Sequence, residues 1–194
     1  MKNLILASSS PRRAELLKQI GLNYQIMVCD VDETLLPGMR PPELVEFLAE
    51  RKAAAVARNL HEGIVLGADT VVVWQGQILG KPLNEEDAFS MLVKLQGSTH
   101  DVYTGVALID VHSGKIMVGH EKTRVFFRNI EEDEIRRYVA SGEPLDKAGA
   151  YGVQGLAAIY INKLEGCYTN VVGLPLARLS VMLKAIGYNV LNDN

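Results

Sequence analysis

The sequence predicts an α/β protein with a mixed sheet and flanking helices. Segments with the strand pattern alternate with segments with the helix pattern along the whole chain, an order typical of this class. The chain has 194 residues, of which 48% are hydrophobic and 22% are charged, as in ordinary globular proteins. Because no linker, repeat or low-complexity tract interrupts it, we expect residues 1–194 to form a single domain.

The individual elements follow from hydrophobic periodicity and from the residues that punctuate it. Apolar runs predict buried strands, apolar stripes at helical spacing predict helices, and Gly, Pro, Asn and Ser mark their ends. The expected strands are Leu4–Ala7, Tyr24–Cys29, Ile64–Val73, Gln77–Leu79, Val102–Asp110, Lys115–Phe127 and Ala157–Asn162. Two helices are expected to begin at Pro11 and directly after Asn84. Three further helices are expected at Glu43–Asn59, Glu131–Ala140 (capped by Asn129) and Leu176–Ile186.

The first strand leads into a hydroxyl-rich turn, Ser8–Ser10, and Pro11 then opens a helix. Proline fits the first helical turn, and the serines before it can cap the helix. The N–H groups and the dipole at a helix start favour an anion, and the guanidinium groups of Arg12 and Arg13 match phosphate oxygens. Two interpretations are open here: a phosphate cradle, or a capped helix with solvated arginines.

Asp69 interrupts an apolar strand that we expect to be central and covered on both faces. A buried carboxylate is normally ion-paired, metal-bound or protonated, because an unpaired charge is costly there. Perturbed acids gather at functional sites, which favours a functional role. The alternative is a salt bridge to a nearby cation or a kink beside Gly67. Lys52, on or near the apolar stripe of its helix, and Lys81, after a strand end, are further candidates, with a surface position as the alternative for each.

The acidic loop after the second strand offers a partner for Asp69. Asp32 or Glu33, together with Asp69, could supply two carboxylate oxygens to Mg²⁺, an ion that keeps several waters and shares its shell with substrate phosphates. Acids in loops are, however, usually just solvated.

The segment Pro144–Gly155 contains three glycines, the acid–lysine pair Asp146 and Lys147, an aromatic side chain and an amide. Glycines let a backbone approach a ligand closely. Tyr151 could stack on a ring, and the amide of Gln154 could read a base edge through its donor and acceptor. A tight structural loop is the alternative.

Several classes of function are excluded by bulk properties. The net charge of −3 offers no general basic surface for a nucleic-acid duplex. Cys29 and Cys167 are far apart, which fits a reducing cytosol and gives no zinc site, and the short apolar N-terminus is neither a signal peptide nor a membrane span. We expect a soluble cytoplasmic protein without nucleic-acid or membrane partners, and a homodimer is among the oligomeric states left open. The histidines have no metal spacing and are interpreted as ordinary polar residues: His61, His100, His112 and His120.

Several short segments, each of modest information, occur in a specific order. They are Leu6–Arg13, Glu33, Leu48–Ala53, Gly67–Thr70, Gly80–Pro82, Leu95–His100, Asp146–Gly155 and Val172–Pro175. Together they resemble the Maf family, the septum-formation-inhibitor-like nucleoside triphosphate pyrophosphatases, over nearly the whole chain. The departures are small, with Gln96 where Ser is commoner and Val153 where Ile is commoner.

The resemblance implies an elongated mixed sheet with flanking helices and two lobes around a cleft, like the fold of inosine triphosphate pyrophosphatases. It implies hydrolysis of a nucleoside triphosphate to the monophosphate and pyrophosphate with a divalent metal, Mg²⁺ or Mn²⁺. The form of Asp146–Gly155 is similar to the branch that acts on dTTP and UTP. The alternatives are the same chemistry on purine or 7-methyl-GTP substrates, and a non-catalytic nucleotide-binding regulator of cell division.

The resemblance also implies a site. In the pyrimidine branch the positions matching Arg12, Thr70 and Gln154 are associated with substrate choice, and the position matching Asp69 with the proton acceptor. Phosphoanhydride hydrolysis depends mostly on positioning and charge stabilisation, which the cations and carboxylates of this chain fit. The expected catalytic residues are Asp69, Glu33, Lys52 and Lys81, with Glu33 and Asp69 as metal ligands. The expected substrate-binding residues are Ser8, Arg12, Arg13, Thr70, Asp146, Lys147 and Gln154.

Overall fold

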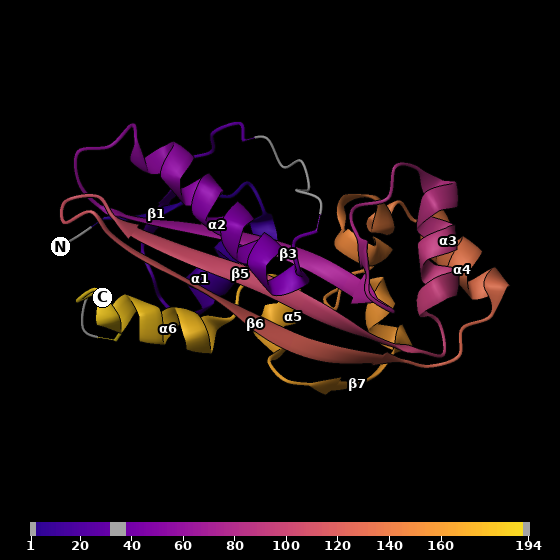
Figure 1. The fold of residues 1–194 in the computed structure, drawn as a ribbon. Helices are drawn as coiled ribbons and strands as arrows, with labels where there is room; N and C mark the ends of the chain where they lie inside the picture. The colour runs from indigo at the N-terminus through magenta and orange to yellow at the C-terminus, as the bar shows by residue number, and fades with distance from the viewer. Residues whose placement is uncertain (1–2, 32–37, 192–194) are drawn as a thin grey trace. The chain divides into compact units, whose positions relative to one another are not determined.

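Within residues 3–31 and 38–191, which the computed structural model describes, seven strands form one mixed sheet (Figure 1). Their order is β2-β1-β3-β5-β6-β7, with β4 paired to β3. β1 is parallel to β2 and β3, whereas β4 is antiparallel to β3 and β7 is antiparallel to β6. The strands are β1 (Leu4–Leu6), β2 (Tyr24–Ile26), β3 (Ile64–Trp74), β4 (Gln77–Leu79), β5 (Thr99–Asp110), β6 (Lys115–Phe127) and β7 (Ile161–Glu165).

The helices alternate with these strands, so the α/β class expected from the sequence is confirmed. They are α1 (Pro11–Gln19), α2 (Pro41–Ala57), α3 (Glu85–Leu95), α4 (Glu132–Ala140), α5 (Tyr168–Val172) and α6 (Leu176–Ala185). Short 3₁₀ turns follow α4: η1 (Glu143–Asp146), η2 (Ala148–Ala150) and η3 (Leu156–Tyr160). Among the helices described, none is at once long enough and apolar enough to cross a membrane.

The chain divides into two compact units. Unit 1 comprises Met1–Asp69, Thr104–Glu121 and Gly173–Asn194, and unit 2 comprises Thr70–Tyr103 and Lys122–Val172. The expected single domain and the expected cleft stay predictions.

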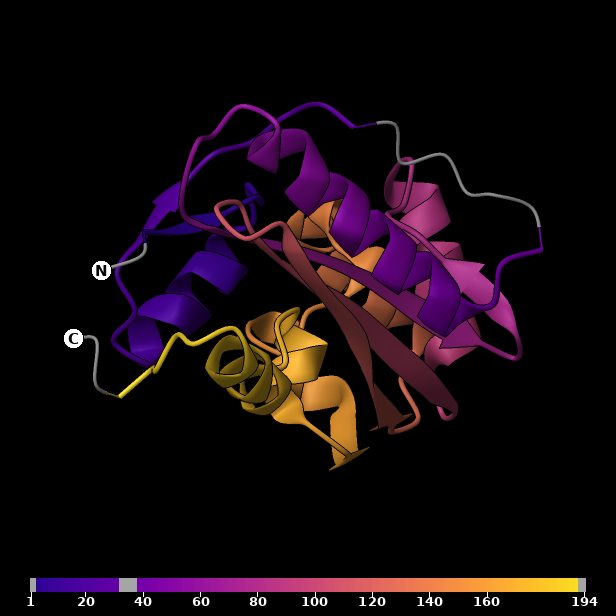
Figure 2. The same ribbon diagram turned by 60° about the vertical axis from the view of Figure 1, so that its left-hand side comes forward.

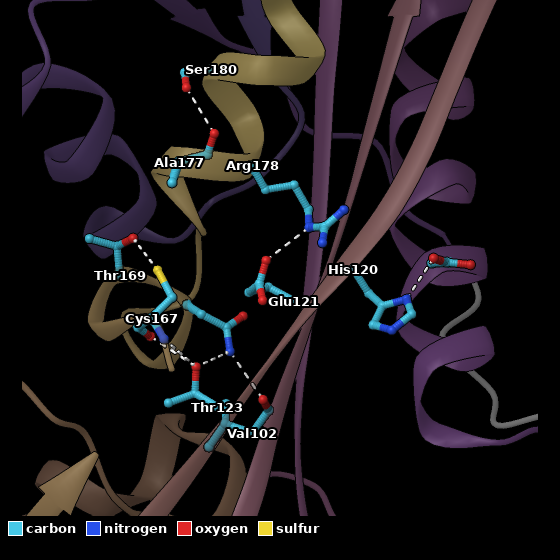
Figure 3. Close-up of polar contacts among 11 residues, drawn as sticks. Val102, His120, Glu121, Thr123, Cys167, Thr169, Ala177, Arg178 and Ser180 are labelled. Atoms are coloured by element: carbon cyan, nitrogen blue, oxygen red, sulfur yellow. Dashed lines mark hydrogen bonds and ion pairs between the residues drawn. The ribbon is translucent and has the colours of Figure 1, made fainter. Parts of the chain in front are cut away.

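In unit 1, α2 covers one face of the sheet, and α1 and α6 lie on the other face (Figures 1 and 2). The core under α2 is built from small and β-branched residues of the helix and of β1, β3 and β5. Its buried members are Ile5, Ala7, Ala49, Ala53, Val56, Val65, Ala107 and Ile109. Polar contacts also hold the unit: His120 Nδ1 lies 2.7 Å from Glu46 Oε1 on α2, and Arg178 Nε on α6 donates to Glu121 Oε2 at 3.0 Å (Figure 3).

In unit 2, α3 packs against α4, and the two helices share an aromatic-rich core with the sheet (Figure 1). Asn170 is fully buried, and its amide nitrogen donates to the Val102 carbonyl at 3.1 Å and to Thr123 Oγ1 at 3.0 Å (Figure 3). Thr123 Oγ1 also accepts from the backbone N–H of Cys167 at 3.0 Å. This network fixes α5, a helix that the sequence did not predict.

Some element boundaries differ from those expected. α2 begins two residues early because Pro41 and Pro42 fit the first helical turn. β2 ends at Ile26, which pairs with Leu6, the last residue of β1. The strand expected at Ala157–Asn162 is present but begins later, at Ile161, because residues 156–160 form η3.

One predicted helix cap is wrong, because the N-cap of α4 is Glu131 and not Asn129. At α1 a serine, Ser10, occupies the N-cap position as expected, although its side chain makes no cap bond.

Candidate active site

Asp69 lies near the middle of β3 and is 8% exposed. Its Oδ1 accepts a hydrogen bond of 2.6 Å from Nζ of Lys52, which α2 presents. Both side chains are largely shielded from solvent, at 11% and 15% exposed. The carboxylate thus has the cationic partner that its burial demands, and the pair places a charged group in an otherwise apolar strand.

Two glycines bring α2 close enough for this pair to form. A Cβ at Gly67 would lie 2.1 Å from the carbonyl oxygen of Ala49, and a Cβ at Gly105 would lie 2.1 Å from that of Val45. Any side chain at either position would therefore push the helix backbone off the sheet. Because Gly67 and Asp69 are two apart on β3, they share the face that α2 covers.

The turn after β1 holds the next group of predicted residues. Ser8 is buried, and its hydroxyl accepts from the backbone N–H of Ser10 at 3.2 Å and from Nη1 of Arg13 at 3.0 Å. Arg13 Nε also donates to the carbonyl of Gly173 at 2.8 Å. Arg13 therefore braces the start of α1, while Arg12 is half-exposed in the same turn.

In unit 2, Thr70 lies on β3, and Lys81 follows Leu79, the last residue of β4, by two residues. Leu79 pairs with Val72 of β3. The carbonyl of Gly80 accepts from the backbone N–H of Gly149 at 2.9 Å. This bond ties the glycine-rich segment to the end of β4, next to Lys81.

The glycine-rich segment is folded tightly. Gly149 has φ +67°, and a Cβ there would meet the side chain of Val72 at 2.9–3.0 Å. Lys147 Nζ donates to the Glu143 carbonyl and to Asp146 Oδ1, both at 2.6 Å, and its stem lies under Gly152. Lys147 is thus internally bonded, whereas Gln154 is exposed.

Glu33, the second predicted metal ligand, lies outside the described residues. In the described part of the chain, no group of three His, Cys, Asp or Glu is placed to hold a metal ion. Mg²⁺ is often held by one or two carboxylates plus phosphate oxygens and waters. The hard carboxylate oxygens of Asp69 are donors of the kind that such a site uses.

His100 is the residue that sequence reasoning missed. It is 3% exposed, and its Nε2 lies 2.7 Å from the hydroxyl of Tyr151 in the glycine-rich segment. Burial lowers the pKa of His100 to about 4. It is therefore not an ordinary polar residue. The one available signal is its place in the segment Leu95–His100, which belongs to the family resemblance; in the structure His100 is the second residue of β5.

The fold is similar to that of a solved structure. The Ham1 protein of Staphylococcus aureus matches 95% of this chain and 100% of its own length, with a TM-score of 0.54 and 17% identity. At that identity the likeness concerns the fold alone, and it agrees with the expected mixed sheet with flanking helices.

The sequence comparisons show the family. The model of the Maf-like protein family matches residues 3–186, so the chain belongs to this family. A protein of Pelotomaculum thermopropionicum named dTTP/UTP pyrophosphatase is 64% identical over 98% of this chain and 100% of its own length. A protein of Desulforamulus reducens with the same name is 52% identical, also over 98% of this chain and 100% of its own length.

Proposed function

We propose that this protein hydrolyses dTTP and UTP to the corresponding monophosphate and pyrophosphate. The observation that carries the proposal is the buried ion pair between Asp69 of β3 and Lys52 of α2, in a chain of the Maf-like family. The relatives at 64% and 52% identity, both named dTTP/UTP pyrophosphatase, support the substrate class.

The reaction joins a water oxygen to the α-phosphorus and breaks the bond from that phosphorus to the bridging oxygen, so that pyrophosphate leaves. Asp69 orients the water and accepts its proton. Lys52 donates to Oδ1 of Asp69 and so fixes the direction of the carboxylate. A fixed carboxylate costs no reorganisation at the moment of reaction.

The triphosphate is held by hydroxyl, guanidinium and ammonium groups. Ser8 and Arg13 are already bonded to each other at the start of α1, where backbone N–H groups also favour an anion. Arg12 and Lys81 add positive charge for the triphosphate and for the departing pyrophosphate. Phosphoryl chemistry depends mainly on positioning and charge, and these groups supply hydrogen-bond donors and positive charge of the kind that it uses.

A divalent cation, Mg²⁺ or Mn²⁺, would be held by Asp69, with Glu33 as the second expected ligand. It would supply positive charge that polarises the phosphate oxygens. Carboxylate donors suit these ions, which prefer hard oxygen ligands.

Gln154 reads the nucleobase, Thr70 and Arg12 take part in the choice of substrate, and Asp146 and Lys147 support the segment that carries Gln154. The amide of Gln154 can pair with the O4 and N3–H edge that uracil and thymine share. A site built to hydrogen-bond its substrate rejects an analogue that leaves those groups unpaired. The cytoplasmic location, the absence of nucleic-acid and membrane partners, and a homodimeric state stay predictions.

The first experiment is a substrate panel in which pyrophosphate release is measured with each NTP and dNTP. UTP and dTTP should exceed CTP and the purine nucleotides, with little dependence on the 2′-hydroxyl. Better turnover of purine nucleotides or 7-methyl-GTP would overturn the substrate class and leave the chemistry standing. No pyrophosphate from any nucleotide would favour the non-catalytic regulator.

The second experiment replaces Asp69 with Asn, which keeps the shape and removes the charge. We expect turnover to fall by on the order of 10²–10⁴-fold, as for the loss of a general base or charge-stabilising group. Asp110→Asn is the matched control, because Asp110 is also a buried aspartate of unit 1 but lies outside the proposed site. Near-normal turnover of a folded Asp69→Asn variant would remove Asp69 from the mechanism.

A further inference from the structure

His100 and Tyr151 form a buried hydrogen-bonded pair in unit 2. His100 Nε2 lies 2.7 Å from the Tyr151 hydroxyl, and His100 and Tyr151 are only 3% and 5% exposed, respectively. The two rings meet edge to face at 5.2 Å between centroids, and both also meet the ring of Phe127, at 5.0 Å and 4.8 Å. The pair is therefore held in one geometry by three mutually packed rings.

Both partners are neutral at physiological pH. Burial lowers the pKa of the His100 imidazole and raises the pKa of the Tyr151 hydroxyl. In the described part of the chain, Nδ1 of His100 is buried without a hydrogen-bond partner. The imidazole thus makes one hydrogen bond, to Tyr151, and leaves its other nitrogen unsatisfied. An apolar ring would fill the same space without that cost, so the polar group calls for an explanation.

Tyr151 anchors the middle of the segment that carries Gln154. Before Tyr151, the N–H of Gly149 donates to Gly80. After Gln154, the N–H of Leu156 donates to Glu143 Oε2 at 3.0 Å. Between these two ties, the chain passes through Tyr151, whose side chain is packed in the aromatic cluster, and then reaches the exposed Gln154.

We propose that His100 is a positioning residue for nucleobase recognition, which through its hydrogen bond to Tyr151 fixes the direction in which residues 149–155 present Gln154. The proposal rests on the proposed function. A side-chain amide can offer either its oxygen or its nitrogen to a base, so it discriminates only where the backbone and the orientation are fixed. Loosening the segment therefore lowers the preference for the uracil edge over the cytosine edge.

The test compares kcat/KM for UTP and for CTP in variants of the full chain. Tyr151→Phe removes one hydroxyl, and His100→Phe keeps a ring and removes the polar partner. In both variants the UTP-to-CTP ratio should fall by about two- to tenfold, the value of one hydrogen bond. His100→Gln, whose amide can reach the Tyr151 hydroxyl, should restore part of the ratio. Because UTP and CTP are compared on the same sample, the ratio does not depend on the fraction of folded enzyme.

Tyr188→Phe is the matched control, since Tyr188 is a tyrosine of the other unit and is 6% exposed. Its loss of a hydroxyl should leave the UTP-to-CTP ratio unchanged. An unchanged ratio in Tyr151→Phe as well would assign His100 a purely structural role and overturn the proposal.

A second measurement separates this inference from the proposed function. Amide hydrogen exchange in a peptide that spans residues 145–158 should be faster in Tyr151→Phe than in the unmodified protein and in Tyr188→Phe. Unchanged exchange in this peptide would refute the anchoring, whatever the enzyme hydrolyses. If the unmodified protein hydrolyses neither UTP nor dTTP, the proposed function and the base-recognition role fail together, and exchange alone then decides whether His100 anchors the segment.

Discussion

The contact between Gly67 and α2 allows the geometry of the Lys52–Asp69 pair to be tested without touching either residue. In Gly67→Ala, the new methyl group would lie 2.1 Å from the Ala49 carbonyl oxygen and 2.9 Å from the Ala53 nitrogen. Relief of this overlap requires α2 to retreat by roughly 1 Å, because well-packed interiors leave no other space. Lys52 lies between these two contacts and must move with the helix.

This displacement sets the size of the expected effects. The bond of 2.6 Å between Lys52 Nζ and Asp69 Oδ1 would lengthen to about 3.5 Å, beyond normal hydrogen-bond range. A misplacement of about 1 Å can cost about 10²-fold in rate, so we expect kcat for UTP to fall by roughly one to two orders of magnitude. Overpacking should also cost about 1–3 kcal/mol, or about 3–10 °C in Tm for a domain of this size.

The assay measures pyrophosphate release from UTP and thermal unfolding on the same preparations. Gly187→Ala is the control, because Gly187 has φ +80° but a Cβ there would meet nothing within 4 Å. It should lower Tm through backbone strain and leave kcat unchanged. Gly105→Ala should destabilise the protein similarly but reduce kcat less, since its clash at Val45 is seven residues from Lys52. A destabilised Gly67→Ala variant with unchanged kcat would refute the argument.

The remaining predictions concern metal and pH. Turnover should require added Mg²⁺ or Mn²⁺ and vanish in excess EDTA, since the proposed ligands are carboxylates, and full activity with the chelator would remove the metal. Burial lowers the pKa of His100 from 6.5 to about 4, and the charge of Asp101 opposes this shift only weakly. As the pH drops below 6.5, the imidazole is therefore protonated in the unfolded chain before it is protonated in the folded protein, and the free energy of unfolding falls. Between pH 7 and pH 4.5 urea unfolding should show a loss of about 2–3 kcal/mol from this group, absent in His100→Gln. The hydrogen bond from Arg128 lowers the pKa of Glu134 to about 2, so the contribution of Glu134 to stability is lost mainly below pH 4.5 and does not mask the effect of His100.

Much of the fold is predictable from the sequence because local patterns determine it. The long apolar run of β3 and the β5–β6 hairpin lie where periodicity and turn residues place them, and Pro11 opens α1 as expected. The errors arise where periodicity carries no information. Residues 156–160 have the apolar content of a strand, but Gly155 with φ +127° leads them into a 3₁₀ turn.

The candidate site is only partly readable from the sequence, because its contacts join residues that are distant in the chain. Asp69 stands out by its own contrast with an apolar strand. That its partner is Lys52 depends on how α2 lies on β3, which Gly67 and Gly105 set. The bond between His100 and Tyr151 joins residues 51 positions apart and leaves no local pattern at either end.

The Lys52–Asp69 pair is better explained by chemistry than by stability. Two charges removed from water lose hydration that their mutual attraction regains only in part, and buried ion pairs can often be replaced by apolar residues at no cost to stability. Elsewhere between α2 and the sheet, Val65 of β3 belongs to one buried cluster with Ala49 and Ala53 of α2, and two more small apolar residues could extend that cluster. The chain instead places an ammonium and a carboxylate there, on a helix seated by two glycines that are themselves unfavourable inside strands. A buried ion pair and two strand glycines both lower stability. Their presence together is expected where the site requires a charged group in a defined position rather than the best packing.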